Sequence, residues 1–258
     1  MTREIPNTQA YLRWREQTQA TFDFCVLVSH AVPTLKRQMT LIDNGIIPHL
    51  PKPDYYPKTS SNESLRAQAQ IYKKQLASYL VISLFSYFEA YVIDAIQEMF
   101  EFHGGLKQFQ ERAAQRDKMF MKSVSAEVYE KKRKLRGKRN KMKISQYRSN
   151  SKKLASMGYR FPSELLSGYG IKMLSQKVAN LKSNEIPDLL THGLHLKLDE
   201  ATINQYHEFR NLRNSIAHGR KVDLSIKEVG ERNEILRNMA YALDLHLNEH
   251  FMIFEDYL

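Results

Sequence analysis

The sequence predicts an all-α protein built as a helical bundle. Apolar side chains recur at steps of three and four residues over long stretches, and no alternating pattern of useful length indicates a strand. Prolines and glycines separate these stretches, and helix-start signals precede several of them. The sequence also lacks a glycine-rich phosphate loop and internal repeats. Helices packed against one another are therefore expected.

The first predicted helix runs from Asn7 to about Asp43, where apolar residues such as Trp14 recur with helical spacing. Pro33 has no amide hydrogen, so we expect this helix to be interrupted or kinked there. Four prolines follow between residues 48 and 57 and favour an extended connector. The predicted segments are an N-terminal helical segment (1–47), a proline-rich linker (48–60) and the main bundle (61–258).

A long second helix is expected to begin at Ser60-Ser-Asn-Glu63, which has the spacing of a capping box. It continues to His103-Gly-Gly105, a length on the order of 55 Å at 1.5 Å per residue. Its second half, LVISLFSYFEAYVIDAI, is apolar on nearly all sides. This half must therefore be buried on more than one side.

An insertion is predicted between the core helices, over about residues 106–198. Residues 106–130 indicate a charged helix that leads into a basic run at residues 131–153. Farther along, apolar residues between Ile171 and Leu181 suggest one more helix. Pro187 and His192-Gly193 indicate loop around it.

The formal net charge of +11 is concentrated in the basic run, which holds twelve Lys or Arg and no Asp or Glu. The rest of the chain is nearly neutral, with 27 basic and 28 acidic residues. Such a run favours contact with the backbone of a polyanion such as RNA, although a solvated, solubilising loop is the alternative. The candidate RNA-binding residues are Lys131, Lys132, Arg133, Lys134, Arg136, Lys138, Arg139, Lys141, Lys143 and Arg148.

Two helices are predicted at the end of the chain. Asp199 can cap a helix that runs through His218 and closes at Gly219, where a left-handed backbone is needed. Ser225-Ile-Lys-Glu228 is a second capping box. A clean apolar stripe from Leu236 to Leu258 follows it and indicates the last helix.

Several classes of protein do not fit this sequence. Mean hydropathy is −0.52, and we expect neither an export signal nor a membrane-spanning segment. Cys25 is the single cysteine, so one chain cannot form a disulfide or a cysteine-based zinc site. A cytoplasmic protein is expected.

The candidate for chemistry is Arg213-Asn-Ser-Ile-Ala-His218, at the end of a predicted helix. Arg213 and His218 are five residues apart, which places their side chains about 140° apart around an ideal helix. Asn214 and His218 share a face, so Asn214 can orient the imidazole. A two-fold dimer interface would bring the groups of two chains around one phosphate. The alternative is structural, because helix C-termini favour cations in general.

This segment resembles the Arg-polar-three residues-His signature of the HEPN superfamily, in particular the standalone prokaryotic RiboL-PSP-HEPN type. The upstream stretch Ser83-Leu-Phe-Ser-Tyr-Phe-Glu89 is similar to the other recurrent piece of that family, a buried helix that ends in aromatic-Glu. The resemblance covers about residues 65–102 and 199–258. It implies an HEPN-like helical bundle, with the basic insertion between its core helices.

The resemblance implies a metal-independent endoribonuclease that acts as a homodimer, in a toxin or phage-defence system with an antitoxin or another regulatory partner. RNA, with tRNA among the candidates, is the implied substrate, and no cofactor is expected. His218 would act as acid or base, and Arg213 would bind the phosphate. Glu89 would pair with Arg213, or else be solvated or paired locally. The alternative function is a catalytically inactive HEPN-like scaffold that binds RNA, nucleotide or a partner protein.

Two other histidine pairs have spacings that metal sites also use. His192 and His195 lie in an apparent loop without a nearby cysteine or carboxylate before Asp199. His246 and His250 lie four apart, but Glu249 does not occupy the position that the zinc-protease motif requires. We therefore expect no metal site.

Overall fold

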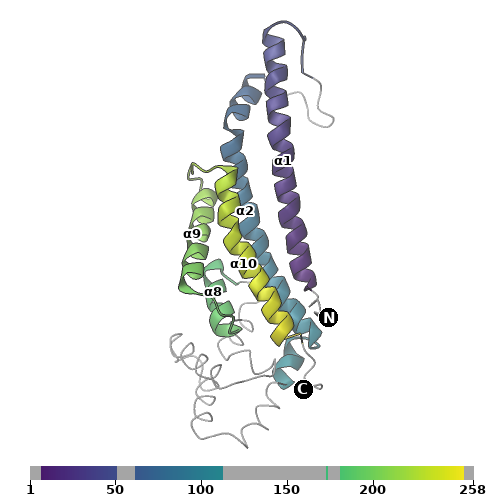
Figure 1. Ribbon diagram of the computed structural model, residues 1–258, viewed down its shortest axis with the longest axis vertical. Helices are drawn as coiled ribbons and strands as arrows, with labels where there is room; N and C mark the ends of the chain where they lie inside the picture. Colours follow the sequence, from purple (N-terminus) through teal and green to yellow (C-terminus); the bar gives the residue numbers. More distant parts are fainter. Residues whose placement is uncertain (1–6, 51–61, 113–172, 174–180, 253–258) are drawn as a thin grey trace, which may run out of the picture. The chain divides into compact units, whose positions relative to one another are not determined.

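The computed structural model describes residues 7–50, 62–112, 173 and 181–252. All the secondary structure in these residues is helical, as Figure 1 shows, which confirms the all-α fold. The four long helices are α1 (Gln9–Asp43), α2 (Asn62–Phe102), α9 (Glu200–Ala217) and α10 (Ile226–His250). The basic run and the expected capping box at residues 60–61 lie outside the described residues.

The expected starts of the last two helices are confirmed by their hydrogen bonds. The amide of Thr202 donates to the Asp199 carboxylate at 2.6 Å, so Asp199 caps α9. The hydroxyl of Ser225 accepts the amide of Glu228 at 3.2 Å, and the Glu228 carboxylate accepts the amide of Ser225 at 2.8 Å. These reciprocal bonds form the capping box of α10.

Helix α1 is continuous through Pro33, so the interruption that we considered there is wrong. Proline removes only one intrahelical donor, and Pro33 is exposed, where water can bind the carbonyl that loses its partner. The next residue, Thr34, donates its hydroxyl to the carbonyl of His30 at 3.1 Å. The helix therefore tolerates the proline.

The loop expected around Pro187 and His192-Gly193 is also wrong. A short helical segment fills this region as η2 (Ser183–Glu185), α8 (Ile186–Asp188) and the π-helical turn η3 (Leu189–Gly193). Pro187 lies in the first turn of α8, where a helix needs no amide donor. Buried apolar side chains then hold the segment: Ile186, Leu189, Leu190 and Leu194.

The contacts divide the chain into two compact units. The first comprises Met1–Trp14, Phe88–Arg210 and Ile235–Leu258. At its centre, the completely buried Tyr91 donates its hydroxyl to the carbonyl of Ala240 at 2.9 Å. The buried Asp244 accepts both the amide and the hydroxyl of Thr8, at 3.0 and 2.6 Å. Burial raises the pKa of Asp244, while these two hydrogen bonds act in the opposite direction.

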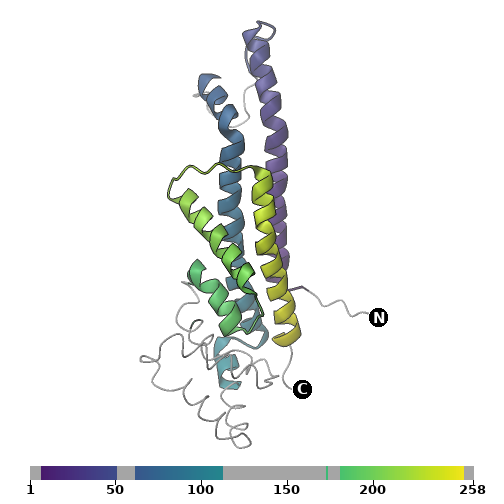
Figure 2. The same cartoon turned by 60° about the vertical axis from the view of Figure 1, so that its left-hand side comes forward.

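The second unit comprises Arg15–Tyr87 and Asn211–Glu234. Its α1 and α2 segments lie side by side and run antiparallel (Figures 1 and 2). Arg66 on α2 donates to both oxygens of Asp43 at the end of α1, at 2.7 and 2.5 Å. The ammonium group of Lys36 lies 5.6 Å from the centroid of the Tyr72 ring. These contacts fix the register of the helical pair.

Helix α2 is apolar enough to span a membrane by length and composition, with a mean hydropathy of 1.6 over 18 residues. The core helix of a soluble protein passes the same test, so the expectation of no membrane-spanning segment stays a prediction. Half of that window is buried inside the protein, as in the core helix of a soluble domain. The apolar half of α2 is indeed buried on several sides, as its sequence predicted.

Candidate functional site at the end of helix α9

The predicted site lies at the C-terminal end of α9, which closes with a regular hydrogen-bonded turn. Gly219 has a φ of +77°, the left-handed conformation that glycine adopts most readily. The amide of Gly219 donates to the carbonyl of Ile216 at 2.9 Å, and that of Arg220 to Ser215 at 3.0 Å. This pair of bonds is the Schellman motif, so His218 is the C-cap residue that directly follows Ala217, the last residue of α9.

His218 is exposed at this turn, whereas Arg213 is half-buried one turn earlier. The guanidinium carbon of Arg213 lies 4.8 Å from the centroid of the Phe85 ring on α2. Phe85 is itself completely buried, so the guanidinium rests on a fixed aromatic surface. The sequence did not predict this contact.

Asn214 is half-buried, and its backbone carbonyl accepts the amide of His218 at 3.0 Å. Within the described part of the chain, the two side chains make no hydrogen bond with each other. The role of Asn214 in orienting the imidazole stays a prediction. Glu89 is half-buried on α2, and its pairing with Arg213 also stays a prediction.

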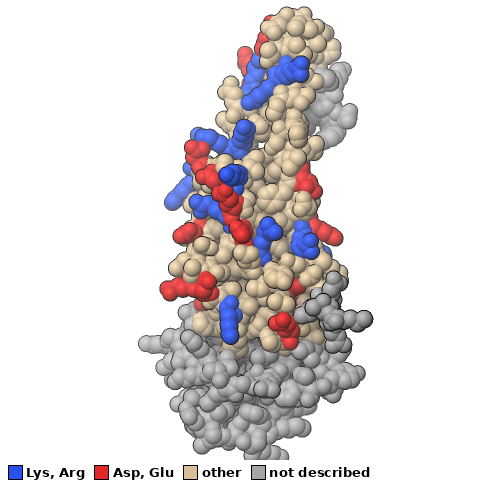
Figure 3. All heavy atoms as spheres, viewed as in Figure 1, with Lys and Arg blue, Asp and Glu red and all other residues tan. Residues whose placement is uncertain are grey.

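The chain that follows His218 adds positive charge to the same end of α9. Arg220 and Lys221 are exposed, and neither forms an ion pair with another described residue. The Asp223 carboxylate forms an ion pair with the ammonium group of Lys74 on α2, at 2.9 Å, and this contact anchors the turn. Figure 3 shows basic side chains, with acidic ones among them, over this part of the molecule. Sequence reasoning missed Arg220 and Lys221, although they directly follow the His218-Gly219 pair.

The other histidines have a different environment. Nε2 of His246 lies 2.7 Å from the backbone carbonyl oxygen of Leu194. Burial, together with His246 and His192, lowers the pKa of His195 to about 4. Burial also lowers the pKa of His246. Among the described residues, no three His, Cys, Asp or Glu side chains form a group suited to a metal ion.

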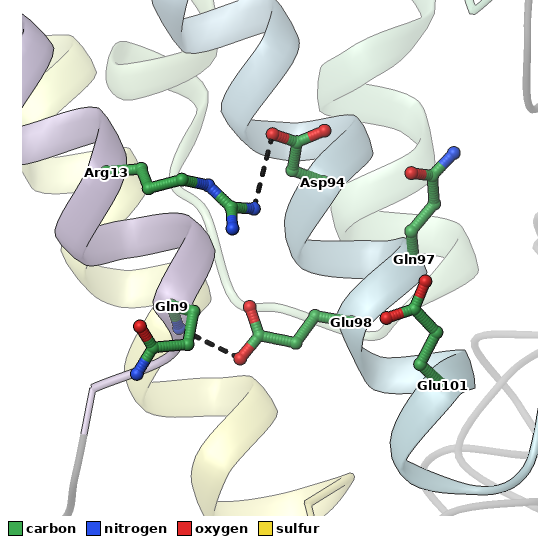
Figure 4. Close-up of a pocket in the computed structure, with 6 residues that line it drawn as sticks. All are labelled: Gln9, Arg13, Asp94, Gln97, Glu98 and Glu101. Atoms are coloured by element: carbon green, nitrogen blue, oxygen red, sulfur yellow. Dashed lines mark hydrogen bonds and ion pairs between the residues drawn. The ribbon is translucent and has the colours of Figure 1, made fainter.

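A polar pocket of about 280 Å³ lies in the first unit, between the start of α1 and the end of α2 (Figure 4). Glu98 accepts the amides of Gln9 and Ala10, both at 2.8 Å, and so caps the N-terminus of α1. Arg13 lies 3.6 Å from Asp94 across the pocket. These carboxylates have a structural role, and none of the predicted site residues lines the pocket.

Comparison with known families identifies the family of the chain. Residues 56–249 match the RiboL-PSP-HEPN family. The chain belongs to this family. No curated protein and no solved structure gives a significant match. Membership in the HEPN superfamily indicates a ribonuclease-like or nucleotide-related function. The match includes α2, α9 and nearly all of α10, whereas α1 lies outside it.

Proposed function

We propose that this HEPN protein is a metal-independent endoribonuclease whose active site forms between two copies of the chain. One observation carries the proposal: an exposed histidine closes α9, with an arginine held on an aromatic ring one turn before it. These are the Arg and His of the segment that resembles the signature of the family. The proposed partners are RNA, with tRNA among the candidates, and a second copy of the chain.

The chemistry follows from the two side chains. In ribonuclease reactions without metal, the ribose 2′-hydroxyl attacks the adjacent phosphorus, and the bond to the 5′-oxygen breaks. Histidine has an ordinary pKa of about 6.5 and can take the proton of the nucleophile or give one to the leaving oxygen. His218 is proposed for this role. Arg213 offers a planar set of donors to the phosphate oxygens, where negative charge grows. The products would be a 2′,3′-cyclic phosphate and a 5′-hydroxyl.

The electrostatics of the helix end support a cation-assisted site. The free carbonyls at the C-terminus of α9 carry partial negative charge, which by itself repels a phosphate. Arg213, Arg220 and Lys221 supply positive charge at this end. We propose that these side chains together offset the repulsion and let the backbone of RNA approach His218.

The same geometry supports a site shared by two copies. Arg213 packs back onto α2, whereas His218 ends the helix in an exposed turn. An ideal helix separates their directions by about 140°. In a two-fold dimer, the histidine of one copy can meet the arginine of the other around one phosphate.

The first test compares the wild type with His218→Ala on total RNA and tRNA in the presence of EDTA. His49→Ala is the matched control, because His49 is another exposed histidine, far from α9 in the sequence. We expect cleavage by the wild type and by the control, and none by His218→Ala. An oligonucleotide with a single 2′-deoxy substitution at the cut position should resist cleavage. If the wild type binds RNA but never cuts it, the protein is the inactive scaffold instead.

We further propose that the protein acts as a toxin or phage-defence effector, held in check by an antitoxin or another regulatory protein. A ribonuclease that can cut the cell's own RNA requires such restraint. Expression of the wild type should arrest growth, and His218→Ala should not. Equal growth of the two strains, at equal protein levels, would contradict this role.

A further inference from the structure

The middle of α1 carries an apolar surface that its own unit leaves uncovered. Between Asp23 and Lys36 the helix contains no Asp, Glu, Lys or Arg. In this stretch, Phe24 and Leu27 are 57% and 63% exposed. A helix that is free of charge over three turns is ordinarily buried on most of its sides. This stretch is therefore suited to contact with another molecule.

The uncovered residues form one face of the helix. Cys25 and Met39 are 3% and 2% exposed and mark the side that packs within the unit. Leu27 lies about 160° around the helix from Cys25. Phe24 and Ala31 flank Leu27 at three- and four-residue steps and are also exposed. The exposed face is thus opposite to the packed one.

This face is not accounted for by the HEPN fold. Helix α1 lies outside the residues that match the family. Six of the seven large apolar side chains that are clearly exposed among the described residues belong to the second unit: Phe24, Val26, Leu27, Ile46, Ile71 and Tyr79. Because α1 and α2 are antiparallel and Lys36 faces Tyr72, Tyr79 lies about level with the centre of this stretch.

The charges at the two ends of the face identify its occupant. Asp23 and Arg37 are both exposed, lie on the exposed side of the helix and are separated by roughly 21 Å along its axis. Asp23 accepts a hydrogen bond from Gln19 at 2.8 Å through one oxygen, and Arg37 has no ion pair with a described residue. A negative group at one end and a positive group at the other make the face complementary to itself when a second copy is turned end over end.

We propose that this face binds the same face of a second copy, with the two α1 helices antiparallel across a two-fold axis near His30. In this register each Asp23 lies opposite the Arg37 of the second copy. Leu27 and Ala31 of the two copies pack between these paired charges. A short helix pair is near the lower end of stable interface sizes, so association in the micromolar range is expected.

Charge reversal tests the pairing directly. Asp23→Arg and Arg37→Asp should each lower the mass measured by sedimentation by about half, because each places like charges together twice per interface. The double variant Asp23→Arg/Arg37→Asp restores both pairs and should recover the wild-type mass. Glu234→Arg, at an exposed position of α10, is the control and should leave the mass unchanged.

Two results overturn the proposal. One is a wild-type mass that neither single reversal changes. The other is a loss of mass in both single variants that the double variant does not recover, which would mean a different occupant or register. Circular dichroism of each variant shows whether the helices are retained. A variant that has lost its helices is replaced by Asp23→Asn or Arg37→Gln, which remove the pair without repulsion and should lower the mass partially.

Cross-linking tests the register. A cysteine at position 30 lies beside its own copy across the axis, so His30→Cys should form an intermolecular disulfide under mild oxidation. Cys25 is buried and is replaced by Ser in this background. Lys73→Cys, an exposed position on α2, is the control and should stay monomeric on a denaturing gel. Equal cross-linking at the two positions contradicts the register.

This inference does not depend on the proposed ribonuclease. Within the second unit, α1 lies on the opposite side of α2 from the end of α9 (Figures 1 and 2). The charge-reversed variants should therefore still cut RNA, and His218→Ala should still associate through α1. A lack of cleavage in every protein removes the ribonuclease proposal and leaves the mass measurement as a valid test of the α1 contact.

Discussion

Two groups of histidines differ in what surrounds them. His218 is exposed at the end of α9, beside a turn that carries the exposed residues Arg220 and Lys221. His195 and His246 are partly buried, and burial lowers the pKa of both. Nε2 of His246 also lies 2.7 Å from the backbone carbonyl oxygen of Leu194. A histidine whose imidazole is hydrogen-bonded to a backbone carbonyl of the protein has a structural role. An exposed histidine at a helix end is accessible to a substrate and can exchange protons with it.

Replacing one histidine of each group by alanine should give opposite defects, and this is the largest expected effect. His218→Ala should lower kcat/KM by at least about a thousandfold, because it removes the proposed acid or base. Its free energy of unfolding should change by less than about 0.5 kcal/mol, since the side chain is exposed. His246→Ala should lower the free energy of unfolding by about 2 kcal/mol, because it leaves the Leu194 carbonyl without this partner.

The measurements are urea unfolding and the initial rate of cleavage per folded molecule. His246→Ala should retain nearly full activity under conditions where it is folded. If His246→Ala abolished cleavage at unchanged stability, the division between structural and functional histidines would be wrong.

The lowered pKa of His195 predicts how stability depends on pH. The folded protein holds this imidazole neutral down to about pH 4, whereas an unfolded chain protonates it near its ordinary pKa of 6.5. The unfolded state therefore binds more protons between these values, and stability falls as the pH falls through this window. The loss should reach about 2 kcal/mol after allowance for solvent screening.

Asparagine at position 195 sharpens this prediction. His195 has a φ of +58°, and asparagine adopts the left-handed region more readily than most residues. His195→Asn should therefore fold normally and lose much less stability between about pH 6.5 and pH 4. Unfolding curves measured across this range check the slope. A slope identical to that of the wild type would assign the pH dependence to other groups.

The turn after His218 should show the smallest effect. Gly219→Ala places a side chain at a φ of +77°, and open space around the added carbon leaves only the conformational cost. This cost is about 1 kcal/mol in the free energy of unfolding. Gly219→Asn should cost less, because asparagine tolerates this conformation. Thermal unfolding of the two variants gives the order, and the reverse order would contradict the assigned turn.

Local signals in the sequence predicted a large part of this fold. The caps at Asp199 and Ser225 and the closing turn at Gly219 depend on neighbouring residues, so they can be read from a short window. Pro33 and Pro187 were interpreted as breaks, although helices tolerate proline where one missing donor is solvated or belongs to the first turn. Proline removes one backbone hydrogen bond of a helix, and the packing of the surrounding residues determines whether the helix ends there.

The sequence predicted which residues make up the candidate site, but it did not predict their contacts. Arg213 and His218 stand in a recognisable spacing, so the sequence placed them correctly at the end of a helix. The contact of Arg213 with Phe85 joins residues that are far apart in the chain, and no local pattern encodes it. The sequence also did not predict that one face of α1 is exposed. Apolar residues at helical spacing predict burial, but they do not show whether the same chain or another molecule buries them.

The most direct test of the central claim mixes two inactive proteins. Arg213→Ala and His218→Ala should each fail to cut RNA, because each lacks one half of every site. If the site combines Arg213 of one copy with His218 of the other, a mixed dimer contains one intact site. An equal mixture that has exchanged subunits should then recover about a quarter of the wild-type cleavage rate. A mixture that exchanges subunits, as shown by mass, and still cuts no RNA would contradict the shared site.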